Sequence, residues 1–421
     1  MGASDTHQAI EAVWRIESAR LVGGLVRLVH DVGLAEDLAQ DALLAALEQW
    51  PESGVPRNPG AWLMAAARNR AIDHLRRAQR VDDKHAVLGR EMDAGVESAE
   101  GALIDALDDP VGDDVLRLMF MTCHPVLSTP ARVALTLRLL GGLTTGEIAR
   151  AFFVPEATIA QRIVRAKRTL AEARVPFEVP RGAELATRLS SVLGVVYLIF
   201  NEGYAATEGD AWMRPVLCED ALRLGRILAE LMPHEAEVHG LVALMEIQAS
   251  RLRARVTASG DPVLLMDQDR SKWDQLHIRR GLAALARAES LGGAYGPYAM
   301  QAAIAACHAR ARTAAETDWV RIAALYDALA QLSPSPVVEL NRAVAVGMAF
   351  GPAAGLEIVE RLCEDGALDR YHLLPSVRAD FLARLGRNDE ARAELARAAS
   401  LTRNAREQAL LLERAAKLPA S

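Results

Sequence analysis

Apolar residues recur at helical spacing along almost the whole chain, and this pattern constrains the fold more than any other feature. Alanine- and leucine-rich segments place apolar side chains at i, i+3 and i+4, whereas the alternation typical of strands is nearly absent. The chain is therefore predicted to be all-α. With 421 residues it is long enough for two or three domains.

The cysteine content and the apolar stretches exclude several classes of protein. The four cysteines stand far apart with no C-x-x-C, so neither a disulfide framework nor a zinc site is indicated, and no metal or cofactor is expected. The first residues lack a basic segment that leads into an apolar one, and the longest apolar stretch, 192–200, is far shorter than a membrane span. A cytoplasmic protein with no membrane partner is predicted. The cysteines are Cys123, Cys218, Cys307 and Cys363.

Charge is distributed unevenly, although the net charge is −7. Residues 57–81 carry six arginines and one acid, and residues 155–174 carry five basic residues and two acids. Between these segments, residues 91–114 hold nine acids and no basic residue. Two phosphate-binding helices, joined by an acidic linker over 91–110, are predicted. The linker is interpreted as solvated chain, and the alternative is that it lies along a basic channel.

The most specific motif is G-G-L-T-T-G-E-I-A-R-A-F-F-V-P-E-A-T-I-A-Q-R, at 141–162. Thr144 and Glu147 fit an S/T-x-x-E capping box, which predicts the start of a short helix. A turn over 152–154 follows, and Pro155 is expected at the first position of the next helix. This order is typical of a helix-turn-helix that binds DNA.

The second helix of this motif has two different faces. One stripe is apolar and should face inward, and the opposite stripe offers amide, hydroxyl and guanidinium groups to base edges and phosphates. A solvated surface with surplus arginine is the alternative. The inward stripe is Ile159, Ile163, Ala166 and Leu170, and the candidate DNA contacts are Glu156, Thr158, Gln161, Arg162, Arg165 and Arg168.

The first basic helix, expected from Trp62 to Arg80, also carries a polar stripe. We expect Leu63, Ala66 and Ile72 to face inward. Asp73 could form an intrahelical ion pair, but the surplus of arginines is too large for one aspartate to explain. Trp62 is interpreted as a core anchor, with a stacking surface for an unpaired base as the alternative. The candidate contacts are Trp62, Asn69, Asp73, Arg76, Arg77 and Arg80.

These segments resemble the extracytoplasmic-function sigma factors of bacterial RNA polymerase. A-E-D-L-A-Q-D-A-L-L-A-A-L-E-Q-W (35–50) and A-W-L-M-A-A-A-R-N-R-A-I-D-H-L-R-R (61–77) resemble their region 2, and residues 135–168 resemble their region 4. The resemblance implies that core RNA polymerase and promoter DNA are partners. It also implies that 35–50 docks on the polymerase through Asp37, Gln40 and Asp41, that 62–80 and the loop before it read the −10 element, and that 155–170 reads the −35 element.

About 240 residues follow region 4, and they resemble the subgroup with a large C-terminal helical extension. The family-like segments are 194–207, 267–274, 296–309 and 318–329. Separately, 385–398 matches the tetratricopeptide pattern, and Gly351 precedes Gly386 by 35 residues, so helical repeats are predicted near 319–415. We expect domains at 1–90, 111–178 and 179–421, with the linker at 91–110.

Two segments of the extension are candidate interdomain or effector sites. The alternative is a helix C-cap at Gly203 and a charged helix start at Asp267. The candidate residues are Asn201, Glu202, Tyr204, Asp267, Asp269, Arg270 and Trp273.

No catalytic motif is present, so an enzyme is not expected. A conventional helix-turn-helix regulator with a C-terminal sensing domain is the alternative to a sigma factor, but it leaves the first basic helix unexplained. The extension, or a separate regulatory protein, is expected to control the sigma part. The promoter sequence, the inducing signal, any ligand and the oligomeric state do not follow from the sequence.

Overall fold

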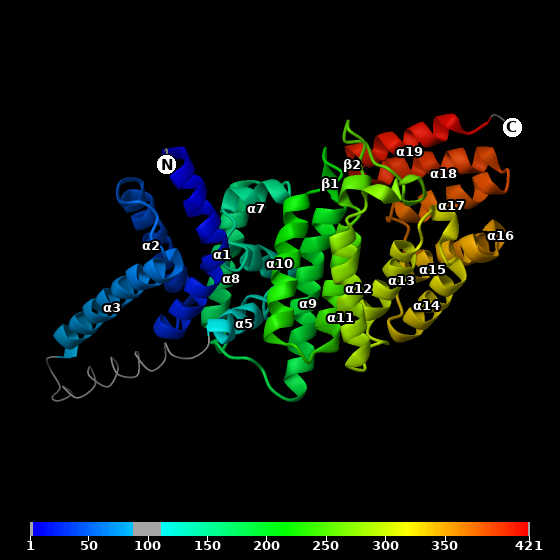
Figure 1. Cartoon of the computed structure of the whole chain (residues 1–421). Helices are drawn as coiled ribbons and strands as arrows, with labels where there is room; N and C mark the ends of the chain where they lie inside the picture. The colour runs from blue at the N-terminus through cyan, green and yellow to red at the C-terminus, as the bar shows by residue number, and fades with distance from the viewer. Residues whose placement is uncertain (1–2, 87–110, 420–421) are drawn as a thin grey trace. The chain divides into compact units, whose positions relative to one another are not determined.

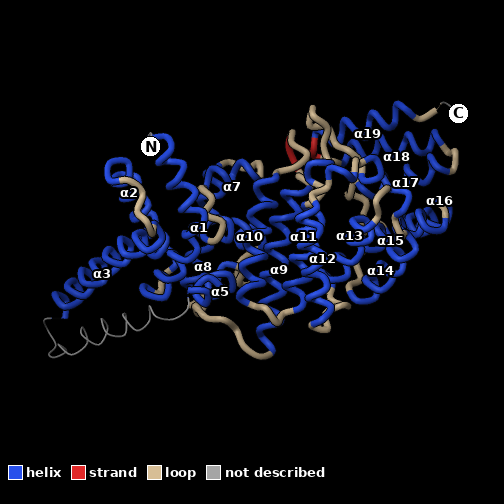
Figure 2. The backbone as a smooth tube through the Cα atoms, in the orientation of Figure 1, coloured by secondary structure: helices blue, strands red, loops and turns tan. Residues whose placement is uncertain are grey.

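The computed structural model describes residues 3–86 and 111–419, and side chains are described for 6–77 and 114–419. In this part of the chain every regular element is a helix except two strands of two residues each (Figure 2). The all-α prediction is therefore confirmed. The acidic linker expected at 91–110 lies outside the described residues.

The chain divides into two compact units, residues 1–196 and 197–421 (Figure 1). The first unit holds seven described helices and the start of an eighth. These are α1 (Ala3–Val29), α2 (Val32–Ser53), α3 (Pro59–Ala86), α5 (Val111–Thr122), α6 (Thr129–Leu139), α7 (Thr145–Ala151), α8 (Glu156–Glu172) and the first part of α9 (Ala183–Tyr204).

Helices α1, α2 and α3 pack against one another and form what we call the first helical group. Its core includes Trp50 and Leu63, each 1% exposed. Asp31 caps α2 by accepting a hydrogen bond from the Leu34 backbone N–H at 2.8 Å. Pro51 lies inside α2, which continues to Ser53 and ends at Gly54 with φ of 82°.

Helices α5 to α8 form the second helical group, which contains the helix-turn-helix. Helix α8 packs on α6 and α7. The two groups also contact each other, since α1 packs against α5 and α6, and α2 packs against α8. Gly23 of α1 allows this approach, because a Cβ there would lie 2.9 Å from the Asp114 carbonyl oxygen.

The first turns of α9 are hydrogen-bonded to the second helical group. Arg188 donates to the Phe120 carbonyl oxygen at 3.0 Å, and the Ser191 hydroxyl donates to the Cys123 carbonyl oxygen at 2.7 Å. By length and composition α9 is the one described helix apolar enough to cross a membrane, and 44% of its most apolar window is buried in the structure. The unit boundary falls inside this helix.

The second unit is a succession of helices with short 3-10 turns. Its elements are β1 (Glu208–Gly209), α10 (Pro215–Leu231), α11 (Ala236–Ala249), η1 (Leu252–Ala254), η2 (Leu265–Asp267), η3 (Arg270–Lys272), α12 (Gln275–Ser290), α13 (Pro297–Arg310), η4 (Ala314–Glu316), α14 (Trp319–Leu332), α15 (Pro336–Phe350), α16 (Pro352–Asp365), α17 (Leu373–Arg384), α18 (Asn388–Leu401), β2 (Arg403–Asn404) and α19 (Ala405–Lys417).

Helices α15 to α18 form two successive helical hairpins. Gly351 and Gly386 lie at the corresponding turns, with φ of 105° and 79°. Phe381 of α17 fills the space beside α15 and α16, since a Cβ added to Gly347 or Gly355 would come within 2.5 Å of its ring. Small residues in one hairpin therefore admit an aromatic ring from the next.

The ends of the second unit are joined through Asn404. Strand β2 pairs in parallel with β1, and the Asn404 side-chain amide donates to the Ala206 and Ala211 carbonyl oxygens at 3.1 and 2.9 Å. Its carbonyl oxygen caps α19 by accepting from the Arg406 and Glu407 backbone N–H groups. The first loop and the last helix of the extension therefore share one buried side chain.

Candidate nucleic-acid interface

Local hydrogen bonds position the helix-turn-helix. Thr144 accepts from the Glu147 backbone N–H, and the Glu147 carboxylate accepts from the Thr144 backbone N–H at 2.8 Å, so the predicted capping box is confirmed. Phe153 takes the turn with φ of 49°. Pro155 is the N-cap of α8 and not its first helical residue, because its ψ of 141° is still extended.

Helix α8 has one buried and one exposed face. Ile159, Ile163, Ala166 and Leu170 are at most 5% exposed, as the apolar stripe predicts. On the other face, four of the six candidate contacts line a groove of about 460 Å³ together with the start of α6. They are Thr158, Gln161, Arg162 and Arg165, and α6 and the turn before it supply Val126, Leu127, Ser128 and Ala131.

The two remaining candidates lie at the ends of this face. Glu156 is exposed in the first turn of α8. Arg168 is exposed and pairs with Glu172 at 2.6 Å, an i,i+4 surface pair that is easily exchanged for a phosphate. Val164, which was not among the predicted contacts, is 64% exposed beside these polar residues. An apolar side chain there can contact a thymine methyl group.

The polar stripe of α3 is exposed. Asn69, Asp73, Arg76 and Arg77 all lie on the surface, while the side chain of Arg80 is outside the described residues. The expected inward face is partly wrong. Leu63 is buried, but Ala67 and Ala71, at 0% exposed, take the places assigned to Ala66 and Ile72, which are half-buried. Helix α3 contacts both α1 and α2, and these contacts set which of its positions are buried.

Trp62 packs edge-on against Trp50, with ring centroids 5.3 Å apart. Trp50 is buried, whereas Trp62 is half-buried. This contact favours the core-anchor interpretation. Before it, the Asn58 side chain accepts from the Ala61 backbone N–H at 3.1 Å, which fixes the loop to the start of α3.

A separate acidic face runs along α2. Asp37 and Asp41 are exposed, and Gln40 is half-buried and donates to Glu36 at 2.7 Å. Leu44 continues the stripe of Asp37 and Asp41 and is 56% exposed. An apolar side chain between acids is typical of a protein contact, and Leu44 was not among the predicted contacts.

Glu36 connects α2 to the helix-turn-helix. It is 4% exposed and forms ion pairs with Arg138 of α6, at 2.5 Å, and with Lys167 of α8. Burial alone would raise the pKa of this carboxyl group, but Lys167 and Arg138 hold the pKa below its ordinary value. No sequence motif marked Glu36 or Lys167, because their partners are distant in the chain.

Further ion pairs join the same two helical groups. Arg15 of α1 pairs with Glu147 at 3.0 Å, and Arg27 pairs with Asp114 of α5 at 3.4 Å. Burial alone would raise the pKa of Glu147, but hydrogen bonds from Thr144 and the charge of Arg15 lower it. Ion pairs therefore add to the helix packing that joins the two groups.

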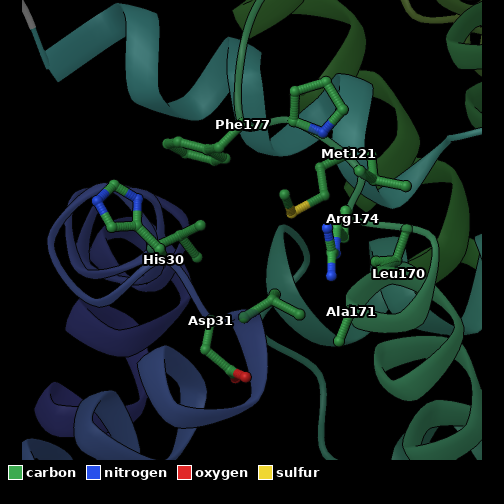
Figure 3. Close-up of a pocket in the computed structure, with 11 residues that line it drawn as sticks. His30, Asp31, Met121, Leu170, Ala171, Arg174 and Phe177 are labelled. Atoms are coloured by element: carbon green, nitrogen blue, oxygen red, sulfur yellow. The ribbon is translucent and has the colours of Figure 1, made fainter.

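A pocket of about 360 Å³ borders this contact. Figure 3 shows His30 and Asp31, from the turn between α1 and α2, on one side. On the other side lie Leu170 and Ala171, from the last turn of α8, and Arg174, which follows the helix. His30 and Arg174 both have positive φ, 54° and 48°. The pocket lies behind the exposed face of α8, since Leu170 belongs to the buried stripe.

Several candidate residues of the extension have structural roles. Glu202 pairs with Arg214 and accepts from the Thr207 hydroxyl at 2.9 Å. Asn201 is exposed in α9. The C-cap suggested at Gly203 is wrong: Gly203 lies inside α9, and a Cβ there would lie 2.7 Å from the Cys218 backbone nitrogen.

The second candidate segment, 267–274, does not have the charged helix start at Asp267 that was the alternative for it. Asp267 is exposed in η2 and begins no α-helix; α12 begins after Asp274, which is its N-cap. Asp269 caps η3 and bonds to Ser271. Tyr204, Arg270 and Trp273 are brought together around two arginines, Arg251 and Arg255, that the sequence analysis did not select.

Comparisons with known proteins match three parts of the chain to family models. Residues 16–81 match the model of Sigma-70 region 2, residues 117–170 that of Sigma-70 region 4, and residues 188–289 that of a family of unknown function (DUF6596). The first two matches cover the helices that carry the exposed polar stripes. No solved structure matches.

Similar curated proteins are bacterial. An uncharacterized protein of Rhizobium meliloti is 44% identical over 93% of this chain and 91% of its own length. A protein named probable ECF RNA polymerase sigma factor SigI of Mycobacterium tuberculosis is 28% identical over 65% of this chain and 93% of its own length. The RNA polymerase sigma-H factor of Pseudomonas aeruginosa is 32% identical over 37% of this chain and 81% of its own length.

Proposed function

Because the chain belongs to the extracytoplasmic-function sigma factors with a large C-terminal helical extension, we propose that it binds core RNA polymerase and directs it to promoters in the cytoplasm. Its first helical group is proposed to read the −10 element and its second the −35 element. Sigma factors initiate transcription and are not themselves enzymes.

The two-faced helix α8 is the observation that carries the −35 assignment. Its buried stripe holds it on α6 and α7, so the opposite face is presented rigidly. That face offers Gln161 and the guanidinium groups of Arg162 and Arg165, which suit base edges and phosphates in a major groove. Exposed Val164 adds an apolar contact.

The −10 assignment rests on α3 and the loop before it. The exposed side chains of Asn69, Arg76 and Arg77 combine amide and guanidinium donors with the carboxylate of Asp73. Opening a base pair costs a few kcal/mol, so a loop that receives a base has to be rigid. The Asn58 hydrogen bond to Ala61 supports this role for the loop.

The polymerase is proposed to bind the acidic face of α2. Asp37 and Asp41 could not face phosphate without repulsion, whereas a basic protein surface would complement them. Leu44 would then supply the apolar centre of the contact.

Reconstituted transcription tests this proposal. Purified core polymerase plus the protein should initiate from promoters that core polymerase alone cannot open. The double variant Arg162→Ala, Arg165→Ala should lose −35-dependent initiation, and Arg181→Ala, an exposed arginine outside α8, is the matched control. Tight duplex binding by the protein alone, with no initiation, would instead identify a conventional helix-turn-helix regulator.

The extension is proposed to regulate or scaffold the sigma part in cis. A truncated protein that tests this should keep residues 1–196 and not stop at residue 179, so that the hydrogen bonds of Arg188 and Ser191 remain. Rising promoter-specific transcription would indicate masking by the extension, and lost transcription would indicate a required scaffold. Unchanged transcription would contradict a role in cis.

A further inference from the structure

The start of the extension contains an alternating series of aromatic rings and arginines, which we call the arginine–aromatic ladder. Arg255 lies between Trp212 and Tyr204, with its guanidinium carbon 5.7 and 3.7 Å from the two ring centroids. Arg251 lies between Tyr204 and Trp273, at 6.0 and 5.3 Å. Arg270 lies 5.0 Å from Trp273. The ladder is therefore Trp212, Arg255, Tyr204, Arg251, Trp273 and Arg270.

Four separate segments build the ladder. Tyr204 ends α9, Trp212 lies in the following loop, the arginines 251 and 255 flank η1, and Arg270 and Trp273 begin and follow η3. Arg255 and Trp273 are buried, at 8% and 3% exposed, while Arg251 and Arg270 are half-buried. The three charges are thus concentrated in one partly desolvated place.

Within the residues that the structure describes, none of these three guanidinium groups forms an ion pair with a carboxylate, although the more distant charge of Glu316 acts on Arg270. Among residues 6–77 and 114–419, no acidic oxygen lies within 4.0 Å of the guanidinium nitrogens of Arg251, Arg255 or Arg270. The nearby acids are engaged elsewhere: Glu202 pairs with Arg214, and Asp269 bonds to Ser271 and pairs with Lys272. Glu316 accepts hydrogen bonds from the Arg312 backbone N–H and the Thr313 hydroxyl. Buried charges in proteins are normally paired, and stacking on rings contributes only about 0.5–2 kcal/mol for each contact without neutralising the charge.

Unpartnered hydrogen-bond donors gather at the same place. The Tyr204 hydroxyl, the Trp212 and Trp273 indole N–H groups and the Arg270 Nε are buried with no hydrogen-bond partner. Donors predominate among these groups, so the partner that is missing is an acceptor.

Arg251 is the arginine whose two terminal guanidinium nitrogens remain available to bind a ligand. Arg270 is used structurally, because it donates to the carbonyl oxygens of His308 and Ala311 and to the Thr317 hydroxyl. Arg255 donates to the Tyr204 carbonyl oxygen at 3.0 Å. Arg251 uses only its Nε, which donates to Gln268 at 3.2 Å, and in the described part of the chain its two terminal nitrogens have no partner.

We propose that the ladder is a binding site for a small molecule with a phosphate or carboxylate group, and that Arg251 is its central contact. A planar guanidinium with both terminal nitrogens available matches the two oxygens of such a group. Arg255 and Arg270 supply the surrounding positive potential. The site goes beyond the proposed sigma function and uses none of the residues assigned to DNA or polymerase.

Calorimetric titration of the full-length protein with inorganic phosphate, at constant ionic strength set with chloride, tests the site. We expect phosphate to bind and to raise the midpoint of thermal unfolding. Arg251→Gln should weaken binding at least about tenfold, the loss expected for a charge-assisted bidentate contact. Arg253→Gln is the matched control, because Arg253 is exposed on the same turn and its substitution removes the same charge. Equal binding by both variants, or no phosphate binding by the wild type, would overturn the proposal.

Malonate, titrated in the same way, separates the two ligand chemistries. Competition with phosphate, lost in Arg251→Gln, would support one shared site, and the tighter of the two identifies the class of natural ligand. A second readout needs no variant: phosphate should protect Arg251, and not Arg253, from phenylglyoxal, as measured by peptide mass spectrometry. Modification of Arg251 at an unchanged rate would contradict the proposal even if Arg251→Gln fails to fold.

Discussion

Lys167, on the helix proposed to read the −35 element, forms an ion pair with Glu36, on the helix proposed to dock on the polymerase. The two helical groups are thus in direct contact. Promoter elements named −10 and −35 lie about 25 base pairs apart, which is roughly 85 Å of straight duplex at 3.4 Å per base pair. If the groups read these elements as proposed, they must separate before both elements can be bound at once.

Replacing the buried carboxylate should favour this separation. Glu36→Gln leaves Arg138 and Lys167 without their shared partner, and we expect a loss of about 3 kcal/mol from the contact. Spin labels at Gln49→Cys and Ala160→Cys, measured by double electron–electron resonance, should report longer distances in this variant. The control is Glu48→Gln, an exposed acid of the same helix. An unchanged distance distribution would show that Glu36 does not hold the groups together.

The acidic face of α2 should need its exposed residue Leu44 to bind core polymerase. Leu44→Ala is expected to weaken binding to core polymerase by about tenfold, because most of a buried leucine side chain is lost from the contact, and Asp41→Ala should also weaken it. Neither change should alter affinity for a −35 duplex. Leu412→Ala, 51% exposed in the extension, serves as the control in the same polymerase-binding assay. If Leu44→Ala binds as tightly as the control, the docking face lies elsewhere.

Val164 should distinguish thymine from uracil in the −35 element. Removing one buried methyl contact costs about 0.8 kcal/mol, so thymine-to-uracil replacement at the contacted step should weaken wild-type binding about fourfold. In Val164→Ala the same replacement should have little effect. Fluorescence anisotropy with matched duplexes measures both. Equal sensitivity of the two proteins at every thymine would exclude the contact.

His308 should make the extension sensitive to acid. Burial, with the positive charges of Arg251 and Arg270, lowers the pKa of His308 to about 4. An unfolded histidine titrates near pH 6.5, so between about pH 6.5 and 4 the unfolded state binds a proton that the folded state does not. Stability should therefore fall by up to about 3 kcal/mol as the pH drops through this window.

Urea unfolding between pH 4.5 and 7.5 measures this dependence. His308→Gln should flatten it, whereas His234→Gln, at an exposed position, should leave the slope unchanged. The same slope in both variants would mean that other groups cause the acid sensitivity.

Features set by neighbouring residues could be predicted from the sequence. The capping box at Thr144 and Glu147, the buried stripe of α8 and the glycine turns at 351 and 386 all depend on contacts within a few residues. Such local rules need no knowledge of the tertiary fold.

The predictions that were wrong or incomplete concern places where segments distant in the sequence meet. Gly203 resembled a helix end, but the close approach of α10 requires a glycine inside α9. The buried positions of α3 depend on its contacts with α1 and α2, and Glu36 pairs with an arginine 102 residues away. The partners of Arg251 likewise come from segments that no sequence period relates.

The hydrogen bond between the Asn404 side chain and the Ala206 carbonyl oxygen joins residues 198 apart, so it can form only after the ribosome has made the chain between them. At 5–20 residues per second, the ribosome needs roughly 10 to 40 s to translate the chain between them. The helices proposed to read the promoter are complete before this interval begins, while the extension cannot close until it ends. Each newly made molecule therefore passes through a period in which its DNA-binding half is present and its extension is unfinished.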